Sequence, residues 1–311
     1  METLHKKFCA ALVFLAAWVC VAEGGTTLSA NRLSSVRSRR MVGGTLAPHV
    51  PWQAMVYLSD SVVDGGYAGG ALISDRWVLT AARNLFVRKS RQDIRGKAPL
   101  IPKVYLGISQ KAELDTAKDV AVEKVVIHPG FQNLSDWDND LALIKLKHPV
   151  IMSNRVTPIP LPERGQDVDR AAHGSGVIAG WGWGILLTPA ASLKHLVFPL
   201  ANQSDCKAEY EHDPFTPAVD ENMFCTGATQ FQENVCFGDA GGALAVLDSQ
   251  TGDVYAAGIL SYDKPCNRHK YAVYMRVSSY LPWIHSVIRG DTGESHGLRY
   301  DTISTMYSWQ Q

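Results

Sequence analysis

From residue 41 onward the sequence predicts an all-β fold, either a sandwich or a barrel. Short apolar segments rich in β-branched residues recur along this region, as expected of strands. Proline and glycine separate the segments and mark turns. The predicted strands are residues 52–58, 70–74, 76–82, 103–107, 120–128, 140–146, 176–182, 192–200, 242–247, 254–260 and 271–277.

Two helices are predicted in the second half of the chain. One covers 204–210, with Ser204 as its N-cap because serine is favoured there. The other covers 278–288, where one apolar stripe is formed by Leu281, Ile284, Val287 and Ile288. Residues 291–311 show no strong period, so we expect a mobile tail outside the folded domain.

The composition is that of a globular protein. The chain has 311 residues, of which 46% are hydrophobic and 19% are charged, and its formal net charge is zero. These values exclude disordered, collagen-like and coiled-coil proteins. The neutral balance gives no global reason to expect binding to nucleic acid.

The N-terminus predicts a secretory signal peptide over residues 1–22. Lys6 and Lys7 form a positive segment, and residues 8–22 form an apolar run too short for a comfortable membrane span. The alternative is an uncleaved anchor, but no stop-transfer pattern follows. We therefore expect the mature protein to be secreted, without a membrane-spanning segment.

Residues 23–40 are small, polar and then basic, and they indicate a propeptide or short leading chain. The segment ends in clustered arginines of the kind that secretory-pathway convertases cleave. We expect cleavage between Arg40 and Met41. A solvated basic linker is the alternative, and the sequence Met41-Val42-Gly43-Gly44 that follows favours cleavage.

Four cysteines remain after removal of the signal peptide, an even number for an oxidising compartment. They are Cys206, Cys225, Cys236 and Cys266. Four cysteines allow three pairings, and their spacing alone does not choose among them. No CxxC pair is present, so the sequence predicts no zinc site.

Five separated motifs carry a resemblance to a known family. They are MVGG at 41–44, WVLTAARN at 77–84, DNDLALIKL at 138–146, GWG at 180–182 and GDAGGALAV at 238–246. In this order they resemble the chymotrypsin-like serine proteases over almost all of 41–288. The resemblance implies a domain over 41–290 with two six-stranded antiparallel β-barrels and a C-terminal helix.

The same resemblance places a degenerate catalytic triad in this chain. In such enzymes a serine attacks the carbonyl, a histidine takes its proton, and an aspartate orients the histidine. Asp140 matches the aspartate, whereas Arg83 occupies the histidine position and Ala240 the serine position. Alanine has no nucleophilic atom, and arginine stays protonated and accepts no proton. We therefore expect no protease activity, and we regard a relocated active site as a remote alternative.

Further roles follow from the resemblance alone. Asp239 matches the residue that pairs with the new N-terminus of Met41 after cleavage, which would order loops 180–186, 234–242 and 262–266. Gly238 and Ala240 match the backbone N–H groups of the oxyanion hole. The specificity-pocket positions carry Asn234, Tyr262, Asp263 and Ala272, whose side chains would narrow it.

The resemblance also pairs Cys206 with Cys225 and Cys236 with Cys266. A salt bridge between Arg83 and Asp140 is a separate hypothesis, because it would satisfy both charges.

Four stretches resemble one branch of that fold, the haptoglobin family. They are VLTAARNLF, VEKVVIHPGF, CFGDAGGALAV and AAGILSYDKPC. Haptoglobins carry a basic residue for histidine and alanine for serine in a protease-like chain. The resemblance implies a plasma protein that captures haemoglobin dimers, limits oxidative damage and iron loss, and directs the complex to a clearance receptor. It implies no cofactor and no metal.

The chain departs from mammalian haptoglobins before its protease-like domain. Those proteins carry complement-control modules there, whereas only about residues 23–40 precede the domain in this sequence. Pro160 also replaces the cysteine that links the two chains of those proteins. We therefore expect a monomer that resembles the shorter haptoglobins of bony fishes.

Several surface features remain open at the level of sequence. Phe237 and Tyr262 are haemoglobin-binding candidates by residue type only. Asn133 and Asn202 begin glycosylation sequons. The basic segment 88–97 supports an alternative function, that of an adaptor or glycosaminoglycan binder in defence or coagulation, although a solvated loop explains it as well.

Overall fold

A computed structural model of the chain describes the residues that build the domain. These are residues 45–47, 50–58, 66–86, 99–115, 117, 119–132, 137–183, 190–211, 218–227, 234–263, 266 and 270–291. The predicted features outside them are the signal peptide, the propeptide with the Arg40–Met41 cleavage site, Asn133, the basic segment 88–97 and the tail after residue 291.

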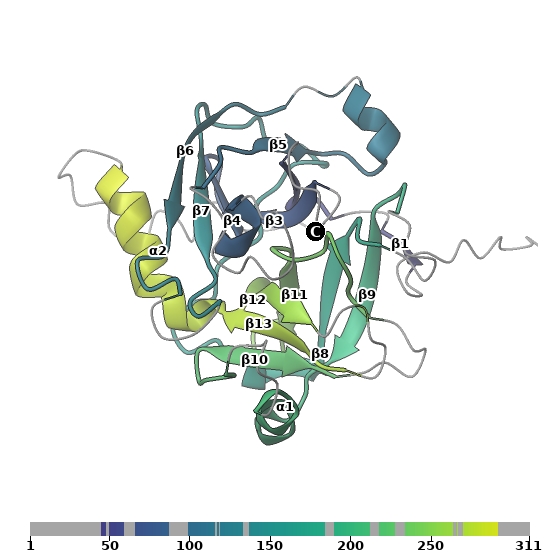
Figure 1. Ribbon diagram of the computed structural model, residues 1–311, viewed down its shortest axis with the longest axis vertical. Coiled ribbons are helices and arrows are strands. Elements are labelled where there is room, and N and C mark those ends of the chain that lie inside the picture. Colours follow the sequence, from purple (N-terminus) through teal and green to yellow (C-terminus); the bar gives the residue numbers. More distant parts are fainter. Residues whose placement is uncertain are drawn as a thin grey trace, which may run out of the picture. The chain divides into compact units, whose positions relative to one another are not determined.

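Strands β2 to β7 form one antiparallel sheet in the order β5-β2-β3-β4-β7-β6 (Figure 1). The backbone N–H of Val120 donates to the carbonyl of Val104, and this bridge joins the two outer strands into a barrel. Ala54, Leu72, Val78 and Ile144 are fully buried inside it. The strands are β2 Gln53–Tyr57, β3 Tyr67–Leu72, β4 Trp77–Thr80, β5 Lys103–Leu106, β6 Val122–Ile127 and β7 Ala142–Leu146.

The second sheet has the order β1-β9-β8-β11-β12-β13-β10 and is also antiparallel. A bridge between Leu200 and Thr226 joins the end of β9 to β10 and closes this sheet. β1 adds only a two-residue edge to β9. The strands are β1 Thr45–Leu46, β8 Ala171–Gly180, β9 Lys194–Pro199, β10 Met223–Thr226, β11 Ala243–Asp248, β12 Val254–Asp263 and β13 Ala272–Arg276.

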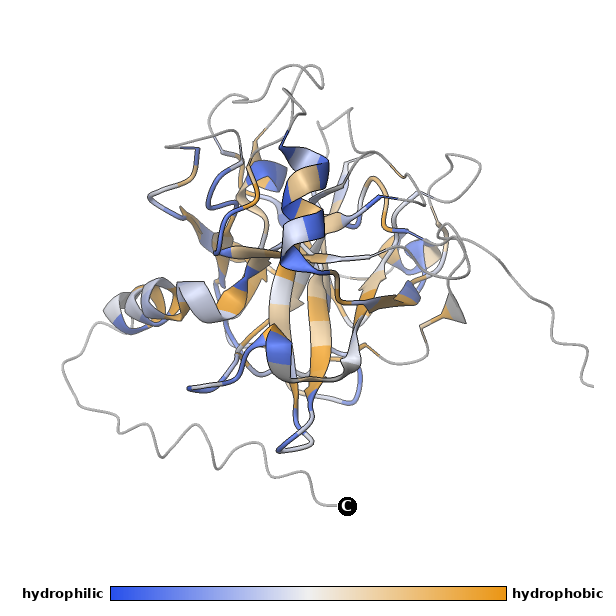
Figure 2. Cartoon of the chain, turned by 90° about the horizontal axis from the view of Figure 1, so that it is seen from below, coloured by the Kyte–Doolittle hydropathy of each residue, from blue (hydrophilic) through white to orange (hydrophobic). Residues whose placement is uncertain are grey.

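The two barrels share a buried core. Leu79 and Leu143 of the first sheet pack in one cluster with Ala243 and Met275 of the second. Gly69 makes the close approach possible, because a Cβ there would lie 2.6 Å from the backbone nitrogen of Gly242. Figure 2 shows hydrophobic residues along the strands and hydrophilic residues at many of the turns. The predicted double six-stranded barrel is confirmed, with the two-residue strand β1 as an addition at the edge of the second sheet.

Two α-helices lie on the outside of the barrels. Helix α1 Gln203–Tyr210 lies beside β10, and α2 Val277–Asp291 begins next to β12 and runs past the end of β6 (Figure 1). The predicted stripe of α2 packs on the shared core, with Ile284 fully buried. The predicted cap of α1 was wrong by two positions. Asn202 is the N-cap, and its side chain accepts a hydrogen bond from the backbone N–H of Ser204. Three short 3-10 helices complete the fold: η1 Ala82–Leu85, η2 Lys111–Asp115 and η3 Val168–Arg170.

Two strands were not predicted, β1 and β10. Both are short, with two and four residues, so neither shows a periodicity of its own. β8 was predicted to start at residue 176, whereas it begins at Ala171. Residues 171–176, Ala-Ala-His-Gly-Ser-Gly, are poor in strand-forming residues, so the first half of β8 shows no strand signal in the sequence.

Candidate functional site

Three segments that are distant in sequence meet between the two barrels. Arg83 lies in η1 directly after β4, and Asp140 lies just before β7. The backbone N–H of Arg83 donates to Oδ1 of Asp140 at 2.7 Å. The Nε atom of Arg83 lies 3.5 Å from Oδ2 of Asp140. The hypothesis of an ion pair at this position is therefore confirmed.

Asp140 is fully buried, so its charge depends on these partners. Its Oδ2 also accepts a hydrogen bond of 2.6 Å from the hydroxyl of Ser261 in β12. One carboxylate thus receives a backbone N–H, a hydroxyl and the charge of a guanidinium. Such charge-assisted contacts stabilise a buried anion.

The Arg83 side chain is held from a second direction. Its guanidinium carbon lies 4.6 Å from the centre of the Trp137 ring, within the range of a cation–π contact. Only 16% of the Arg83 side chain is exposed. Asp140 and Trp137 therefore fix the cation at the position where the family resemblance expects a histidine.

Ala240 lies beside this cluster. Its carbonyl accepts hydrogen bonds from Asn84 Nδ2 at 2.9 Å and from the backbone N–H of Gly69 at 2.8 Å. The hydroxyl of Thr80 in turn donates to the carbonyl of Gly69. Because Asn84 follows Arg83 directly, these bonds bring the Ala240 loop to the end of η1. The structure thus assembles Arg83, Asp140 and Ala240 around one point.

The backbone of the Ala240 loop alternates between paired and open N–H groups. The N–H groups of Asp239, Gly241 and Gly242 donate to backbone carbonyls. Those of Gly238 and Ala240 have no acceptor within the described part of the chain. Gly238 has a φ of +93°, a conformation that favours glycine. This is the pattern expected of an oxyanion hole, in which two N–H groups point to a ligand.

Asp239 is buried at the base of the same loop. Its Oδ1 accepts from the N–H of Gly182 at 2.8 Å, and its Oδ2 accepts from the N–H of Cys236 at 2.9 Å. Gly180 and Gly182 leave the space that this carboxylate fills, since a Cβ on either would collide with it. Its predicted partner, the ammonium of Met41, lies outside the described residues.

Sequence comparison decides which family this arrangement belongs to. Residues 41–284 match the Trypsin family model. The chain is 36% identical to haptoglobin of Mesocricetus auratus over 267 residues, which cover 80% of this chain and 70% of that protein. It is also 36% identical to haptoglobin of Canis lupus familiaris over 269 residues, covering 81% and 75% of the two chains. Haptoglobin-related protein of Homo sapiens is 35% identical over 266 residues, covering 80% and 70%.

The chain belongs to the haptoglobins, within the trypsin family.

The two disulfides of this haptoglobin pair as the family resemblance implied. Cys206 in α1 bonds to Cys225 in β10, and Cys236 bonds to Cys266. The first ties a surface helix to the second sheet, and the second ties the Ala240 loop to the segment after β12. Both bonds therefore brace the half of the molecule that carries Ala240.

The specificity-pocket positions of this haptoglobin are filled with side chains. Asn234 is buried, and its Nδ2 donates to the carbonyl of Lys270. Ala272 is 1% exposed. Tyr262 is also 1% exposed, and its ring packs edge-on to Tyr210 at 5.4 Å. Burial and the Asp220 carboxylate raise the pKa of Tyr262, so its phenol stays neutral.

This burial corrects one prediction. Tyr262 was a candidate anchor for haemoglobin, but a side chain inside the core offers no surface to a partner. The strand β12 has a register shift between Leu260 and Tyr262, so the regular alternation of inward and outward side chains fails there. Phe237 is only half-buried, and its ring lies 5.8 Å from that of Trp183.

Three residues at the site were missed in the sequence. Trp137 and Ser261 contact Arg83 and Asp140 across the fold, and no local pattern marks either. Lys111 is the third, with its Nζ 4.1 Å from the centre of the Tyr67 ring. Burial lowers the pKa of Lys111 to about 8, against the opposing attraction of the Asp239 carboxylate.

The described residues contain neither a metal-binding cluster nor a membrane-spanning helix. Across those ranges no group of three or more His, Cys, Asp or Glu side chains is arranged to hold a metal ion. No helix there is both long and apolar enough to cross a membrane.

Proposed function

We propose that this chain is a secreted plasma protein that captures free haemoglobin dimers. The observation that carries the proposal is the identity of 34–36% with haptoglobins and haptoglobin-related proteins over about four fifths of the chain. Capture would limit oxidative damage by released haem and loss of iron.

Binding proceeds without proteolysis in this proposal. Arg83 holds its proton and is already committed to Asp140 and Trp137, so it takes no proton from a nucleophile. Ala240 offers only a methyl group where a nucleophile is required. Nucleophile and base act as a unit, so loss of both leaves only background catalysis.

Haemoglobin is expected to contact loops at the edge of the two barrels, because binding residues favour loops on a rigid scaffold. A protein interface of standard size buries about 800 Å² on each partner. Aromatic and arginine side chains are the usual anchors. The half-buried pair Phe237 and Trp183 fits this description better than Tyr262 does.

Processing is part of the proposal. A signal peptide over residues 1–22 is removed, and cleavage after Arg40 frees the ammonium of Met41 for Asp239. The burial of Asp239 supports this, because a buried carboxylate is stable only with compensating partners. Limited proteolysis of an Arg40→Gln variant beside cleaved wild type tests it. Faster cutting of the uncleaved variant within 180–186 or 262–266 is expected, and equal cutting contradicts it.

Titration calorimetry of the mature protein with oxyhaemoglobin tests the main proposal. Saturable binding near one αβ dimer per chain supports it. No binding by a correctly folded and cleaved protein overturns it. The alternative function, an adaptor that binds glycosaminoglycans, depends on residues 88–97, which lie outside the described residues. Retention on a heparin column at physiological salt, without haemoglobin binding, would favour that alternative.

A further inference from the structure

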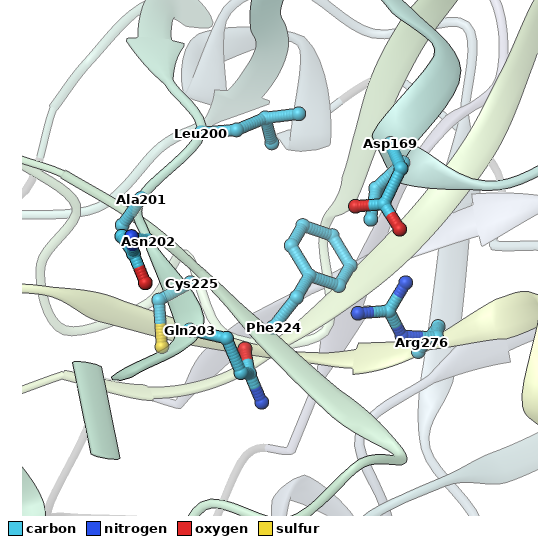
Figure 3. Close-up of a pocket in the computed structure, with 9 residues that line it drawn as sticks. Asp169, Leu200, Ala201, Asn202, Gln203, Phe224, Cys225 and Arg276 are labelled. Carbon is cyan, nitrogen blue, oxygen red and sulfur yellow. The ribbon is translucent and has the colours of Figure 1, made fainter. Parts of the chain in front are cut away.

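A pocket of about 200 Å³ lies on the second barrel, away from Arg83 and Ala240. It is bounded by η3, by the start of α1 and by β10 and β13. Figure 3 shows the Phe224 ring between Asn202 on one side and Asp169 and Arg276 on the other. Its lining residues are Val168, Asp169, Leu200, Ala201, Asn202, Gln203, Phe224, Cys225 and Arg276.

The lining combines an apolar surface with polar groups that keep part of their hydrogen-bonding capacity. Phe224 and Leu200 provide the apolar part. The Nε2 of Gln203 donates to the carbonyls of Asp220 and Met223, and its Oε1 remains as an acceptor. Asp169 is exposed and makes no hydrogen bond or ion pair to any other described residue. The Arg276 guanidinium lies 5.6 Å from the Phe224 ring. Its Nη1 is paired with Asp167, so only its remaining N–H groups can donate to a ligand.

This chemistry matches a sugar ring. A pyranose presents C–H groups on its faces, which suit Phe224 and Leu200, and hydroxyl groups at its edge. Those hydroxyls both donate and accept, so Asp169, Gln203 and Arg276 together can satisfy them. An N-acetyl group adds a methyl for the apolar part and an amide for the polar part.

Asn202 stands at the rim and begins the sequon Asn202-Gln203-Ser204. Its Oδ1 accepts from the backbone N–H of Ser204 at 2.9 Å and from the Ser204 hydroxyl at 2.8 Å. Its Nδ2, the atom that receives a glycan, makes no hydrogen bond within the described residues. The side chain is exposed, so the capping bonds fix the amide and leave Nδ2 open.

We propose that Asn202 carries an N-linked glycan whose first N-acetylglucosamine occupies this pocket. Modification joins Nδ2 of Asn202 to the anomeric carbon of the sugar. It breaks the bond from that carbon to the diphosphate of a lipid-linked oligosaccharide donor and releases the lipid diphosphate and one amide proton. The inference is independent of haemoglobin binding.

Tethering explains why the chain's own glycan is the occupant. A sugar attached to the rim has an effective concentration in the millimolar range, so weak contacts suffice to hold it. A free sugar would need to supply that affinity from a small pocket alone. With the first sugar seated, the bond between it and Asn202 is shielded by the pocket wall.

Two endoglycosidases distinguish a seated sugar from an exposed one. The protein is secreted from cells that make only high-mannose glycans, and mass spectrometry of glycopeptides shows whether Asn202 is modified. Endoglycosidase H cuts after the first sugar, whereas PNGase F cuts at Asn202 itself. We expect endoglycosidase H to act on the native protein readily. PNGase F should act at least about tenfold more slowly on native than on denatured protein, a difference that corresponds to local protection.

Matched variants test whether this pocket is what protects the bond between Asn202 and the first sugar from PNGase F. Asp169→Ala should raise the native PNGase F rate towards the denatured rate. Asp205→Ala, an exposed position of α1 that does not line the pocket, should leave it unchanged. Ser204→Ala removes the glycan and also the hydroxyl bond to Asn202 Oδ1, but it keeps the backbone cap. It should lower the melting temperature by roughly 2–4 °C relative to glycosylated Ser204→Thr. The difference should be smaller when both variants are made without N-glycosylation, where only the hydroxyl bond distinguishes them.

Three results would overturn the proposal. If Asn202 is unmodified in the secreted protein, there is no glycan to occupy the pocket. Equal PNGase F rates on native and denatured protein show that the first sugar is not held. Equal melting temperatures of Ser204→Ala and Ser204→Thr show that it adds no packing, and the pocket is then free for an external ligand.

Discussion

Arg83 gives the neighbouring carboxylate of Asp140 a structural role. In a protease the aspartate orients a base that gains and loses protons, whereas Asp140 faces a permanent cation. The pair is static because Arg83 is also held against Trp137. Arg83 and Asp140, both from the first barrel, form a structural ion pair where Ser261 of the second barrel meets them.

Removal of the cation should destabilise the fold. Arg83→Ala leaves Asp140 with the backbone N–H of residue 83 and the Ser261 hydroxyl but without its counter-charge. We expect a loss of about 1–3 kcal/mol in the free energy of unfolding, measured by urea denaturation. Arg83→Lys is the control and should lose less, since it restores the charge. No change in Arg83→Ala would show that the two hydrogen bonds suffice.

Active-site labelling tests the degenerate triad. Wild type should not react with a fluorophosphonate probe, and Ala240→Ser should react only at a slow background rate, since Arg83 accepts no proton from a serine. The double variant Arg83→His with Ala240→Ser should react about 10²-fold faster than Ala240→Ser, the contribution of a general base. Labelling of wild type would reveal a relocated active site.

Tyr262 has a role in stability and none in surface recognition. Its ring contacts Tyr210 and lies 5.8 Å from Trp137, so truncation opens a cavity. Tyr262→Ala should cost about 3–5 kcal/mol by thermal or urea unfolding. Tyr262→Phe keeps the ring and should cost less. The haemoglobin affinity of the folded fraction should stay the same, and a specific loss of affinity would contradict this assignment.

At the scale of elements, helix α2 packs against the segment after β6 through His128. The Nδ1 of His128 accepts a hydrogen bond from the N–H of Gly130 at 3.1 Å. Its ring meets Tyr280 and Trp283 of α2 edge-on, at 5.3 and 4.8 Å. Burial lowers the pKa of His128, so the folded state prefers the neutral ring.

This preference makes stability depend on pH. The unfolded state takes up a proton near pH 6.5, before the folded state does. The contribution of His128 is therefore full above about pH 6.5 and is lost as the pH falls towards the lower folded pKa. His128→Asn, which keeps an acceptor near Nδ1, should lose less stability than wild type between pH 7.5 and 5.5. His285 is a second histidine whose pKa is lowered by burial, so His285→Asn is measured for comparison. An unchanged pH profile in His128→Asn would exclude this histidine as the source.

At the scale of the whole molecule, the chain is expected to act alone. Pro160 stands where the resemblance expects an interchain cysteine, and its carbonyl accepts from the N–H of Ala256 within the chain. Sedimentation of the mature protein should give a monomer, and addition of haemoglobin should give one complex of one chain with one αβ dimer. A disulfide-linked dimer on a non-reducing gel would contradict this.

The sequence was sufficient where the signal is local or repeated. Buried residues such as Leu79 and Ile144 follow from strands rich in apolar residues, and α2 follows from its apolar stripe. The choice of Asn202 over Ser204 as cap could not be made, because both are good caps two residues apart. The contact of Trp137 with Arg83 depends on how two distant segments meet. Tyr262 was misplaced because an irregular strand breaks the alternation on which the prediction depended.

Closure of both sheets affects the tendency of the protein to aggregate at high concentration. An open edge strand presents a row of unpaired N–H and carbonyl groups that can recruit another chain. The bridges Val104–Val120 and Leu200–Thr226 use those groups within the molecule, and β1 exposes only a two-residue edge. For the haemoglobin capture proposed above, the protein would have to persist at high concentration until haemoglobin is released. Sheets that close on themselves would resist aggregation during that time.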